Sequence, residues 1–543
     1  MHPRLAGHAV VEQLLAHDAD VAFCVPGESY LAVLDGLYDA RDRIDLITAR
    51  QEGGAAMMAA AYGKLTGRPG VCLVTRGPGA TNASIGVHTA HQDASPMVLL
   101  VGQVSTEHLG RRSFQEVDYQ QMFGSLAKDV VRVDRADRVP ELIARAFHTA
   151  VSGEPGPVVV ALPEDVLGHT TDAPVVRPGG TVRPGVASSD VEAFVTDLGR
   201  AARPLVVAGG TGWDQPSTRR LRQFAEAFGV PVAAAFRNQD VMANTSDVYV
   251  GPLGLRTTDG LSAAVREADL VAFLGTRPDA ASMDDHGLLA VPQPTQRVTH
   301  IHPDPDVIHH VYRADHAIVA GPAEFVMALP ASPQDIPALQ EDSALQAERT
   351  AWCGRLRENY LRSLATPSAG SPDSLAYMQV FNDRAPGDTI ISTGAGAYTS
   401  WPQRHRRFTA YPSQAGTQSG AMGYGLPAAI AAKLAFPDRT VVAFAGDGCI
   451  LMTGQELSTA VRYGLDIVVV VVNNSRYGTI RNHQEAAYPG RVVGTELVNP
   501  DFVALAGAFG AHGVRVHTPS EFRSALDACL DSGGTSLIEI VTE

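Results

Sequence analysis

The stretch VVAFAGDGCI, residues 441–450, runs from an apolar segment into an acidic residue that stands between two glycines. Its first residues are apolar or small, as expected for a strand that is covered on both faces. Asp447 follows directly, and a carboxylate at such a place is costly to desolvate unless a positive charge or hydrogen-bond donors meet it. Gly446 and Gly448 leave room for a ligand close to the backbone. The stretch therefore predicts a ligand site at the carboxyl end of a buried strand.

The chemistry of this ligand follows from the charge of Asp447. A helix is expected after the strand, and the amides at its start would favour an anion, which Asp447 would repel. A divalent cation between the two resolves the conflict, and Mg²⁺ favours one or two protein oxygens together with phosphate oxygens and water. Alone, the GDG segment also fits a tight turn.

A second polar pair strengthens the interpretation. Asn473 and Asn474 follow the apolar run IVVVVV at 467–472. If the two apolar segments are neighbouring parallel strands, their carboxyl ends share one edge of the sheet, where open α/β sheets bind ligands. The Asn-Asn pair alone also fits a helix cap, but the two motifs together indicate a site for Mg²⁺ and phosphate.

The whole chain shows the pattern of an α/β protein. Apolar strand candidates alternate with amphipathic helical stretches, which implies βαβ units and open parallel sheets. Two segments rich in Pro, Gly, Ser and Thr, at 168–190 and across much of 329–374, are interpreted as linkers. We therefore expect three doubly wound parallel-sheet domains at 1–168, 190–330 and 370–543. The strand candidates are 71–75, 97–102, 157–163, 204–210, 269–275, 440–446 and 467–472.

Composition narrows the classes of partner. The formal net charge of -15 over 543 residues argues against nucleic acid or an anionic membrane as the main partner. The five cysteines are scattered without a CxxC pair, which favours a reducing compartment and no disulfide framework. The longest apolar run, 467–472, is too short to span a bilayer, and residues 1–21 contain no signal-peptide core. We expect a cytoplasmic protein.

The GDG segment followed by NN at 473–474 resembles the diphosphate-binding motif of thiamine diphosphate (ThDP) enzymes. The resemblance implies that Asp447, the Asn474 side chain and the Arg476 carbonyl bind Mg²⁺. It also implies a diphosphate held near the backbone of this motif. The cofactor-binding residues implied here are Gly446, Gly448, Cys449, Asn474 and Tyr477.

The stretch ITARQEGGAAMMAAAYGKLTGRPGVCLVTRGPGATN at 47–82 resembles the amino-terminal domain of acetolactate synthases and related 2-oxo acid decarboxylases. The resemblance implies that Glu52 binds the aminopyrimidine ring and promotes loss of the thiazolium proton, a step that needs a base held out of water. Without the resemblance, Glu52 is an ordinary acid in the first turn of a helix. FQEVD at 114–118 implies that Phe114 and Gln115 lie near the reacting centre.

Two more segments agree with this family. STGAGAYTSW at 392–401 resembles the loop that touches the diphosphate, and GAMGYGLPAAIAAKLA at 420–435 resembles the segment that bends the cofactor. Met422 would lie between the two cofactor rings, although most buried methionines simply fill a core. The residues implied are Gly396, Ala397 and Tyr398 for the diphosphate, and Gly420 and Met422 for the rings.

The resemblance implies a ThDP- and Mg²⁺-dependent carboligase of the acetolactate synthase type. It would decarboxylate a small 2-oxo acid such as pyruvate and join the acyl carbanion to a second carbonyl. A ThDP-dependent decarboxylase or lyase, a flavin-linked pyruvate oxidase and a catalytically silent paralogue are the alternatives. One departure concerns the segment after NN, where this chain has SRYGTIRNHQEAAYPGR in place of the Gln- and Trp-containing helix of most synthases. Arg481, His483 and Gln484 of this segment are candidates to line a polar pocket, and an exposed helix face is the alternative.

The resemblance also bears on FAD and on assembly. VVAGGTG at 206–212 and FLGTRPDA at 273–280, with Arg277, resemble positions used for FAD in acetolactate synthases, yet many relatives keep the fold without flavin. A Gly-rich turn after a strand is weak evidence for a nucleotide, so FAD stays open. In this family the glutamate acts on a cofactor bound by a neighbouring subunit, which implies a homodimer or homotetramer with active sites between subunits.

Overall fold

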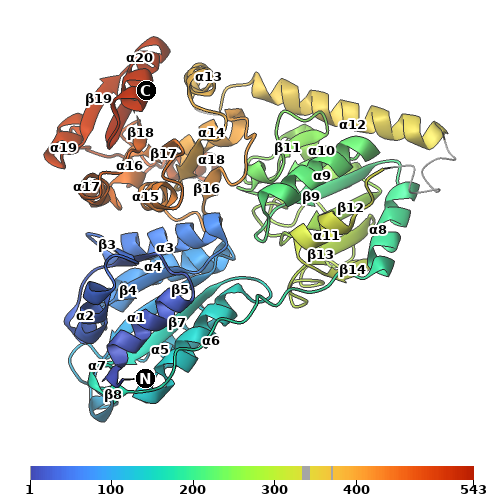
Figure 1. Ribbon diagram of the computed structural model, residues 1–543. Coiled ribbons are helices and arrows are strands. Elements are labelled where there is room, and N and C mark those ends of the chain that lie inside the picture. Colours follow the sequence, from blue (N-terminus) through green and yellow to red (C-terminus); the bar gives the residue numbers. More distant parts are fainter. Residues whose placement is uncertain (1, 333–342, 369–370, 543) are drawn as a thin grey trace. The chain divides into compact units, whose positions relative to one another are not determined.

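The computed structural model describes residues 2–332, 343–368 and 371–542. These residues form three six-stranded sheets in succession along the chain, each with helices against it (Figure 1). The chain divides into two compact units. The first comprises Met1–Thr181, Ile391–Thr399 and Ala415–Glu543, and the second comprises Val182–Ile390 and Ser400–Gln414. The predicted α/β class with three parallel-sheet domains is confirmed, while the exact domain limits remain a prediction.

The amino-terminal sheet has the order β3-β2-β4-β5-β7-β6, and its five strand pairs are all parallel. One face is covered by α1 and α6, whose buried apolar residues pack with alternate residues of the strands. α3 and α4 pack against each other and against strands of the same sheet. The strands are β2 (Val21–Cys24), β3 (Asp45–Thr48), β4 (Gly70–Val74), β5 (Met97–Gln103), β6 (Asp129–Arg132) and β7 (Pro157–Pro163); the helices are α1 (Ala6–Ala16), α3 (Glu52–Thr66), α4 (Pro78–Gln92) and α6 (Val139–Val151).

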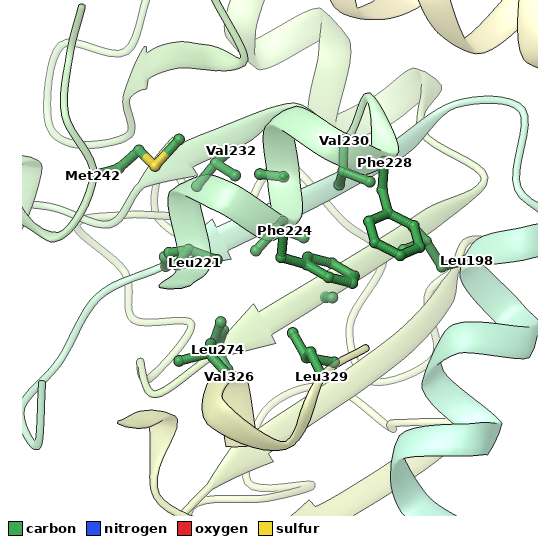
Figure 2. Packing of buried hydrophobic residues seen from close by; sticks show 14 of the residues in the cluster. Leu198, Leu221, Phe224, Phe228, Val230, Val232, Met242, Leu274, Val326 and Leu329 are labelled. Atoms are coloured by element: carbon green, nitrogen blue, oxygen red, sulfur yellow. The ribbon is translucent and has the colours of Figure 1, made fainter. Parts of the chain in front are cut away.

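The central sheet lies in the second unit and has the order β11-β10-β9-β12-β13-β14, again with five parallel pairs. Figure 2 shows the apolar cluster on one of its faces, where Phe224 and Phe228 lie with Leu198, Leu274 and Val326. The strands are β9 (Pro204–Ala208), β10 (Val232–Ala234), β11 (Tyr249–Pro252), β12 (Leu270–Leu274), β13 (Arg297–His302) and β14 (His316–Val319); the helices of this cluster are α8 (Ser188–Arg200), α9 (Gln215–Phe228) and α11 (Pro322–Ala328).

A long helix interrupts the linker expected across 329–374. α12 (Ser343–Leu364) places Trp352 and Leu356 in a second apolar cluster of the central domain, so this part of the prediction is wrong. Its buried residues recur at roughly helical spacing, while the Pro- and Ser-rich segments on either side dominate the composition. Residues 333–342 and 369–370 of the expected linker lie outside the described residues.

Three buried histidines make the stability of the second unit sensitive to acid. Burial lowers the pKa of His300 to about 3, and burial also lowers the pKa values of His302 and His405 to about 4. The ordinary value is about 6.5, so the unfolded chain binds these protons at a higher pH than the folded chain does. Their contribution to stability is therefore complete above pH 6.5 and is lost as the pH falls toward 4.

We expect the free energy of unfolding to fall by about 1.4 kcal/mol per pH unit for each of these histidines below pH 6.5. Denaturant titrations followed by tryptophan fluorescence measure this directly, because Trp213, Trp352 and Trp401 are the three tryptophans and all lie in the second unit. A His302→Gln variant should show a shallower pH dependence. An unfolding midpoint that does not move between pH 7.5 and pH 5 contradicts the prediction.

The carboxy-terminal sheet has the order β16-β15-β17-β18-β20-β19. β17 and β18 are parallel neighbours, and Gly446 is paired with Val472, so Asp447 and Asn473 follow at the same edge. This confirms the premise on which the two polar motifs were combined. All seven strand candidates correspond to strands. The strands of this sheet are β15 (Ile390–Thr393), β16 (Gln414–Gly416), β17 (Val441–Gly446), β18 (Val468–Asn473), β19 (His512–Val516) and β20 (Ser536–Val541).

Among the residues that the structure describes, no helix is both long enough and apolar enough to cross a bilayer.

Candidate active site

The carboxylate of Asp447 is buried at the end of β17 and is held by neutral donors. Asp447 is 3% exposed to solvent. Oδ1 accepts the Gly448 N–H at 2.9 Å, and Oδ2 accepts the Asn499 Nδ2–H at 2.8 Å. Among the described residues, no lysine, arginine or histidine forms an ion pair with it. A buried carboxylate that lacks a cationic side chain is the arrangement in which a metal ion supplies the missing positive charge.

Asn473, the last residue of β18, lies in the same network, and Asn474 follows it in a turn. Asn499 Nδ2 also donates to Asn473 Oδ1 at 2.9 Å, which ties the two strand ends together. Asn474 Oδ1 accepts the Arg476 N–H at 3.3 Å, a long bond, and the intervening Ser475 has a positive φ of 53°. This turn brings the Asn474 side chain close to the Arg476 N–H, and metal ligation by Asn474 and the Arg476 carbonyl stays a prediction.

The donor chemistry of this cluster fits Mg²⁺. A carboxylate, an amide oxygen and a backbone carbonyl are the hard oxygen ligands that Mg²⁺ prefers. Asn499 Oδ1 is buried and has no hydrogen-bond partner within the described part of the chain, although its amide group contacts Asp447. An orphaned acceptor beside a carboxylate is explained by a cation or by a water bound to one. The described residues contain no group of three or more His, Cys, Asp or Glu side chains suited to a metal, so a site with one carboxylate is the candidate.

The two glycines of the GDG segment each face a tyrosine ring. A Cβ at Gly446 would lie 2.8 Å from Cδ1 of Tyr398, and a Cβ at Gly448 would overlap Cε1 of Tyr477. The two tyrosine rings therefore pack against the two glycines that flank Asp447 in the sequence. In this chain the glycines are required by protein packing, whether or not a ligand also approaches the backbone there.

This packing gives a prediction for Gly448→Ala. The added methyl group would force the Tyr477 ring or the Asp447 backbone to move, so we expect ThDP to bind about 10-fold more weakly in the presence of Mg²⁺, the lower end of the range for disturbing groups that support a metal ligand. Equilibrium titration of the cofactor measures this. Gly454→Ala is the matched control, because a Cβ at Gly454 meets no atom within 4 Å. Equal affinity in the two variants contradicts the packing argument.

A hydrogen-bond network on Cys449 joins the other predicted cofactor segments. The Tyr398 hydroxyl donates to Cys449 Sγ at 3.2 Å and accepts the Gly394 N–H at 3.1 Å. The Gly423 N–H also donates to Cys449 Sγ at 3.2 Å. The half-buried Met422 lies next to this contact, immediately before α15 (Gly425–Ala435). The segments near 396–398, 422–423 and 446–449 are thus assembled at one place.

The remaining predicted residues of this domain lie around the same place. Ala397 lies near the turn after Asn474, since its Cβ is 3.9 Å from a Cβ built on Gly478. Gly396 has φ +142°, and a Cβ there would lie 2.9 Å from Cε1 of Tyr398. Gly420 is exposed and has φ +65°, so it ends the loop after β16 in a conformation that favours glycine.

Glu52 begins α3 in the amino-terminal domain. Its predecessor Gln51 caps the helix, since Gln51 Oε1 accepts the Gly54 N–H at 3.0 Å. The half-buried Glu52 side chain accepts a hydrogen bond from Asn82 Nδ2 at 2.9 Å. Among the described residues this is its only hydrogen bond, and none reaches the Asp447 network in the same chain. The carboxylate is therefore available to a further partner.

Gln115 and Glu52 flank the turn that starts α4. A Cβ at Gly77 would lie 2.7 Å from the backbone oxygen of Gln115, and a Cβ at Gly79 would lie 3.6 Å from Glu52 Oε1. Gln115 has a positive φ of 64°, which is uncommon for a residue with a side chain. Phe114 beside it is 74% exposed, so its ring does not belong to the buried core of the described residues.

Glu456 and Asn499 were not predicted from the sequence. Glu456 ends the short 3-10 helix Gly454–Glu456 and is fully buried, and its carboxylate accepts backbone N–H groups of Arg50 and Gln51. Asn499 connects Asp447 and Asn473, as described above. Both residues act through contacts between segments that are distant in the sequence. The signals that the sequence offered were the position of Glu456 nine residues after Asp447 and that of Asn499 shortly before the helix that begins at Phe502.

The helix after the Asn-Asn motif, α18 (Gly478–Ala487), has no buried residue. The candidate pocket residue Gln484 uses both ends of its amide on the Val493 backbone, at 2.9 and 3.1 Å. Arg481 lies 3.7 Å from Glu496. These contacts hold the segment together and leave His483 as the candidate without a described structural contact.

The three domains each match a known family. Residues 4–122 match the family described as "Thiamine pyrophosphate enzyme, N-terminal TPP binding domain". Residues 174–329 match its "central domain", and residues 394–540 match its "C-terminal TPP binding domain". Thiamine pyrophosphate is another name for thiamine diphosphate. The fold and the matched domains define an enzyme that depends on this cofactor.

Curated relatives extend the likeness over nearly the whole chain. It is 33% identical to the Acetolactate synthase isozyme 2 large subunit of Escherichia coli (strain K12), over 98% of this chain and 94% of that protein. It is 33% identical to the Acetolactate synthase large subunit of Parasynechococcus marenigrum (strain WH8102), over 98% of this chain and 86% of that protein. The chain belongs to the family of thiamine pyrophosphate enzymes that includes these acetolactate synthase large subunits.

Proposed function

We propose that the chain is a ThDP- and Mg²⁺-dependent carboligase of the acetolactate synthase type. It decarboxylates a small 2-oxo acid such as pyruvate and joins the remaining acyl unit to a second carbonyl compound. The observation that carries the proposal is the buried Asp447 cluster at the shared carboxyl edge of β17 and β18. The names of the curated relatives support the choice of reaction.

The residues of the cluster have different roles in holding the cofactor. Asp447, the Asn474 side chain and the Arg476 carbonyl would hold Mg²⁺, which would supply the positive charge that a diphosphate needs beside Asp447. The cofactor-facing group comprises Gly446, Gly448, Cys449, Tyr477, Gly396, Ala397, Tyr398, Gly420 and Met422. Within it, Tyr398 and Tyr477 fix the GDG turn through ring packing, so their contribution is to orient Asp447 rather than to supply charge.

Residues of the amino-terminal domain would promote loss of the thiazolium proton of the cofactor. Glu52, held at the start of α3 with Asn82 on one carboxylate oxygen, supplies the acid-base group, and Phe114 and Gln115 would line the reacting centre. When bound, thiamine diphosphate supplies the electron sink that makes decarboxylation of a 2-oxo acid feasible.

A second copy of the chain would complete the site. Among the residues that the structure describes, the Glu52 carboxylate bonds only within the amino-terminal domain, and exposed apolar side chains flank both halves of the site. Ile85 lies beside the start of α3, and Leu451 and Met452 lie three and four residues after Gly448; these residues are 39%, 43% and 49% exposed. Exposed apolar groups beside functional residues are typical of surfaces that another subunit covers. A homodimer is therefore the smallest proposed active form, and a homotetramer is compatible with it.

FAD does not enter the proposal. Gly210 and Gly275 both have φ near +70°, and a Cβ on Gly210 would overlap the Gly275 carbonyl oxygen. A Cβ on Gly275 would lie 2.7 Å from Pro322. The two glycine turns are explained by their packing on each other, so they give no support to a bound nucleotide.

The test is a product assay of the purified protein with ThDP, Mg²⁺ and pyruvate. Circular dichroism of the chiral product detects acetolactate, and its formation supports the proposal. Release of acetaldehyde without acetolactate indicates a decarboxylase, and formation of hydrogen peroxide indicates an oxidase. Repeating the assay with added FAD shows whether flavin is required.

A further inference from the structure

The carboxylate of Glu456 connects the two halves of the first unit at the point where α3 begins. Oε1 accepts the Arg50 and Gln51 N–H groups, each at 3.1 Å, and Oε2 accepts the Arg50 N–H at 3.2 Å. The Thr459 hydroxyl donates to Oε2 at 2.6 Å. Arg50 and Gln51 are the two residues that precede Glu52 in the sequence.

The fit around Glu456 is tight on the side of α3. A Cβ at Gly54 would lie 2.8 Å from Glu456 Oε1, so an alanine at this helix position would force the carboxylate to shift. The Gly54 N–H in turn caps onto Gln51. The first turn of α3 is therefore fixed by a carboxylate from outside the helix and by the cap at its own start.

The placement is costly for the protein. Glu456 is 0% exposed, and none of the described residues forms an ion pair with it, so neutral donors balance most of its charge, with a smaller contribution from the positive charge of Arg50. Burial raises its pKa above the usual value, although the hydrogen bonds from Thr459, Arg50 and Gln51 oppose this. A buried, unpaired carboxylate destabilises a fold unless its hydrogen bonds serve a purpose.

We propose that Glu456 is a positioning residue for Glu52. By fixing the backbone of residues 50 and 51, it sets the direction in which the Glu52 carboxylate leaves α3. Glu456 also lies nine residues after Asp447 in the same domain. The inference rests on the proposed function, in which Glu52 acts on a cofactor held by a second copy. Glu456 then links the metal-binding segment of one subunit to the acid-base group that serves the other site.

The test follows the proton that Glu52 is proposed to handle. Hydrogen–deuterium exchange at thiazolium C2 of the bound ThDP, quenched in acid and read by NMR, reports this step without any substrate. In Glu456→Gln, an NH2 group replaces one of the two carboxylate oxygens, so either the Thr459 hydroxyl or the Arg50 and Gln51 N–H groups lose an acceptor, the negative charge is lost, and the turn before Glu52 is held less firmly. We expect exchange to slow about 10- to 100-fold, because small displacements of a reacting group have effects of this size. The Kd for ThDP with Mg²⁺ should stay within about 2-fold of the wild-type value, since Asp447 is unchanged.

Two controls separate positioning from general loss of stability. Asp197→Asn alters a buried carboxylate of the central domain that pairs with Arg297 and His316, and it should leave the exchange rate unchanged. Gly54→Ala places a methyl group against Glu456 Oε1 while adding a better helix former. It should slow exchange as well, and it decides the question if Glu456→Gln does not fold.

The role of Glu456 and the role of Glu52 are overturned by different results. If Glu52→Gln slows exchange while folded Glu456→Gln and Gly54→Ala exchange at the wild-type rate, the positioning role is overturned and the proposed function stands. If Glu52→Gln itself exchanges at the wild-type rate, the proposed role of Glu52 fails. Slow exchange in Glu456→Gln and Gly54→Ala with preserved cofactor affinity supports the inference.

Discussion

Replacing Glu52 by Gln should lower turnover of the 2-oxo acid by about 100- to 10,000-fold, the range that a positioned acid-base group contributes. The amide keeps the size of the side chain and its acceptor for Asn82, so α3 should still begin at residue 52. It cannot exchange a proton near neutral pH. Steady-state turnover with pyruvate, measured at saturating ThDP and Mg²⁺, gives the value.

The matched control is Glu141→Gln. Glu141 is an exposed acid of α6 in the same domain and pairs with Arg138. Turnover should be unaffected there, because exposed ion pairs of this kind contribute little. ThDP affinity should be nearly equal in both variants. Full turnover in Glu52→Gln would contradict the assignment of Glu52 as the acid-base group.

The sheets could be predicted from the sequence because parallel strands are buried on both faces. Runs such as 157–163 and 467–472 are apolar at every position and need no knowledge of their neighbours. Continuous apolar runs do not identify α12, whose apolar residues are sparse and which lies between Pro- and Ser-rich segments. There, packing of Trp352 against the central sheet outweighs a composition that suggests a linker.

The candidate site was predictable to the extent that it is local. Asp447 and Asn474 stand in short motifs at strand ends, and the parallel pairing of β17 with β18 brings those ends together. Glu456 and Asn499 were missed because their roles depend on tertiary contacts. Glu456 meets residues 50 and 51 across more than 400 positions of sequence, a contact that no local spacing specifies.

The packing of tyrosines on the GDG glycines also depended on the fold. The sequence suggested that Gly446 and Gly448 leave room for a ligand, whereas the structure shows Tyr398 and Tyr477 beside them. The distinction matters for interpreting variants. A substitution at either glycine acts first on protein packing, and its effect on the cofactor follows from the position of Asp447.

The second large effect is expected for Asp447→Ala, which should weaken ThDP binding by about 100-fold or more and remove its dependence on Mg²⁺. The carboxylate is the only charged group in the proposed ligand set, and a hard cation without it has amide and carbonyl oxygens alone. Calorimetric titration with ThDP, with and without Mg²⁺, measures both quantities. The wild-type protein should bind more tightly with Mg²⁺, and the variant should bind equally weakly in both conditions.

Asn499→Ala separates the charge of Asp447 from its orientation. The variant keeps the carboxylate and loses the amide that holds it and Asn473, so we expect weaker ThDP binding by about 10-fold with the Mg²⁺ dependence retained. A residue that supports a metal-binding side chain changes how tightly the metal is held. Loss of the metal-binding carboxylate itself removes the contribution of the metal to ThDP binding. Unchanged cofactor affinity in Asp447→Ala would show that the diphosphate is held without this carboxylate, and the metal assignment would then be wrong.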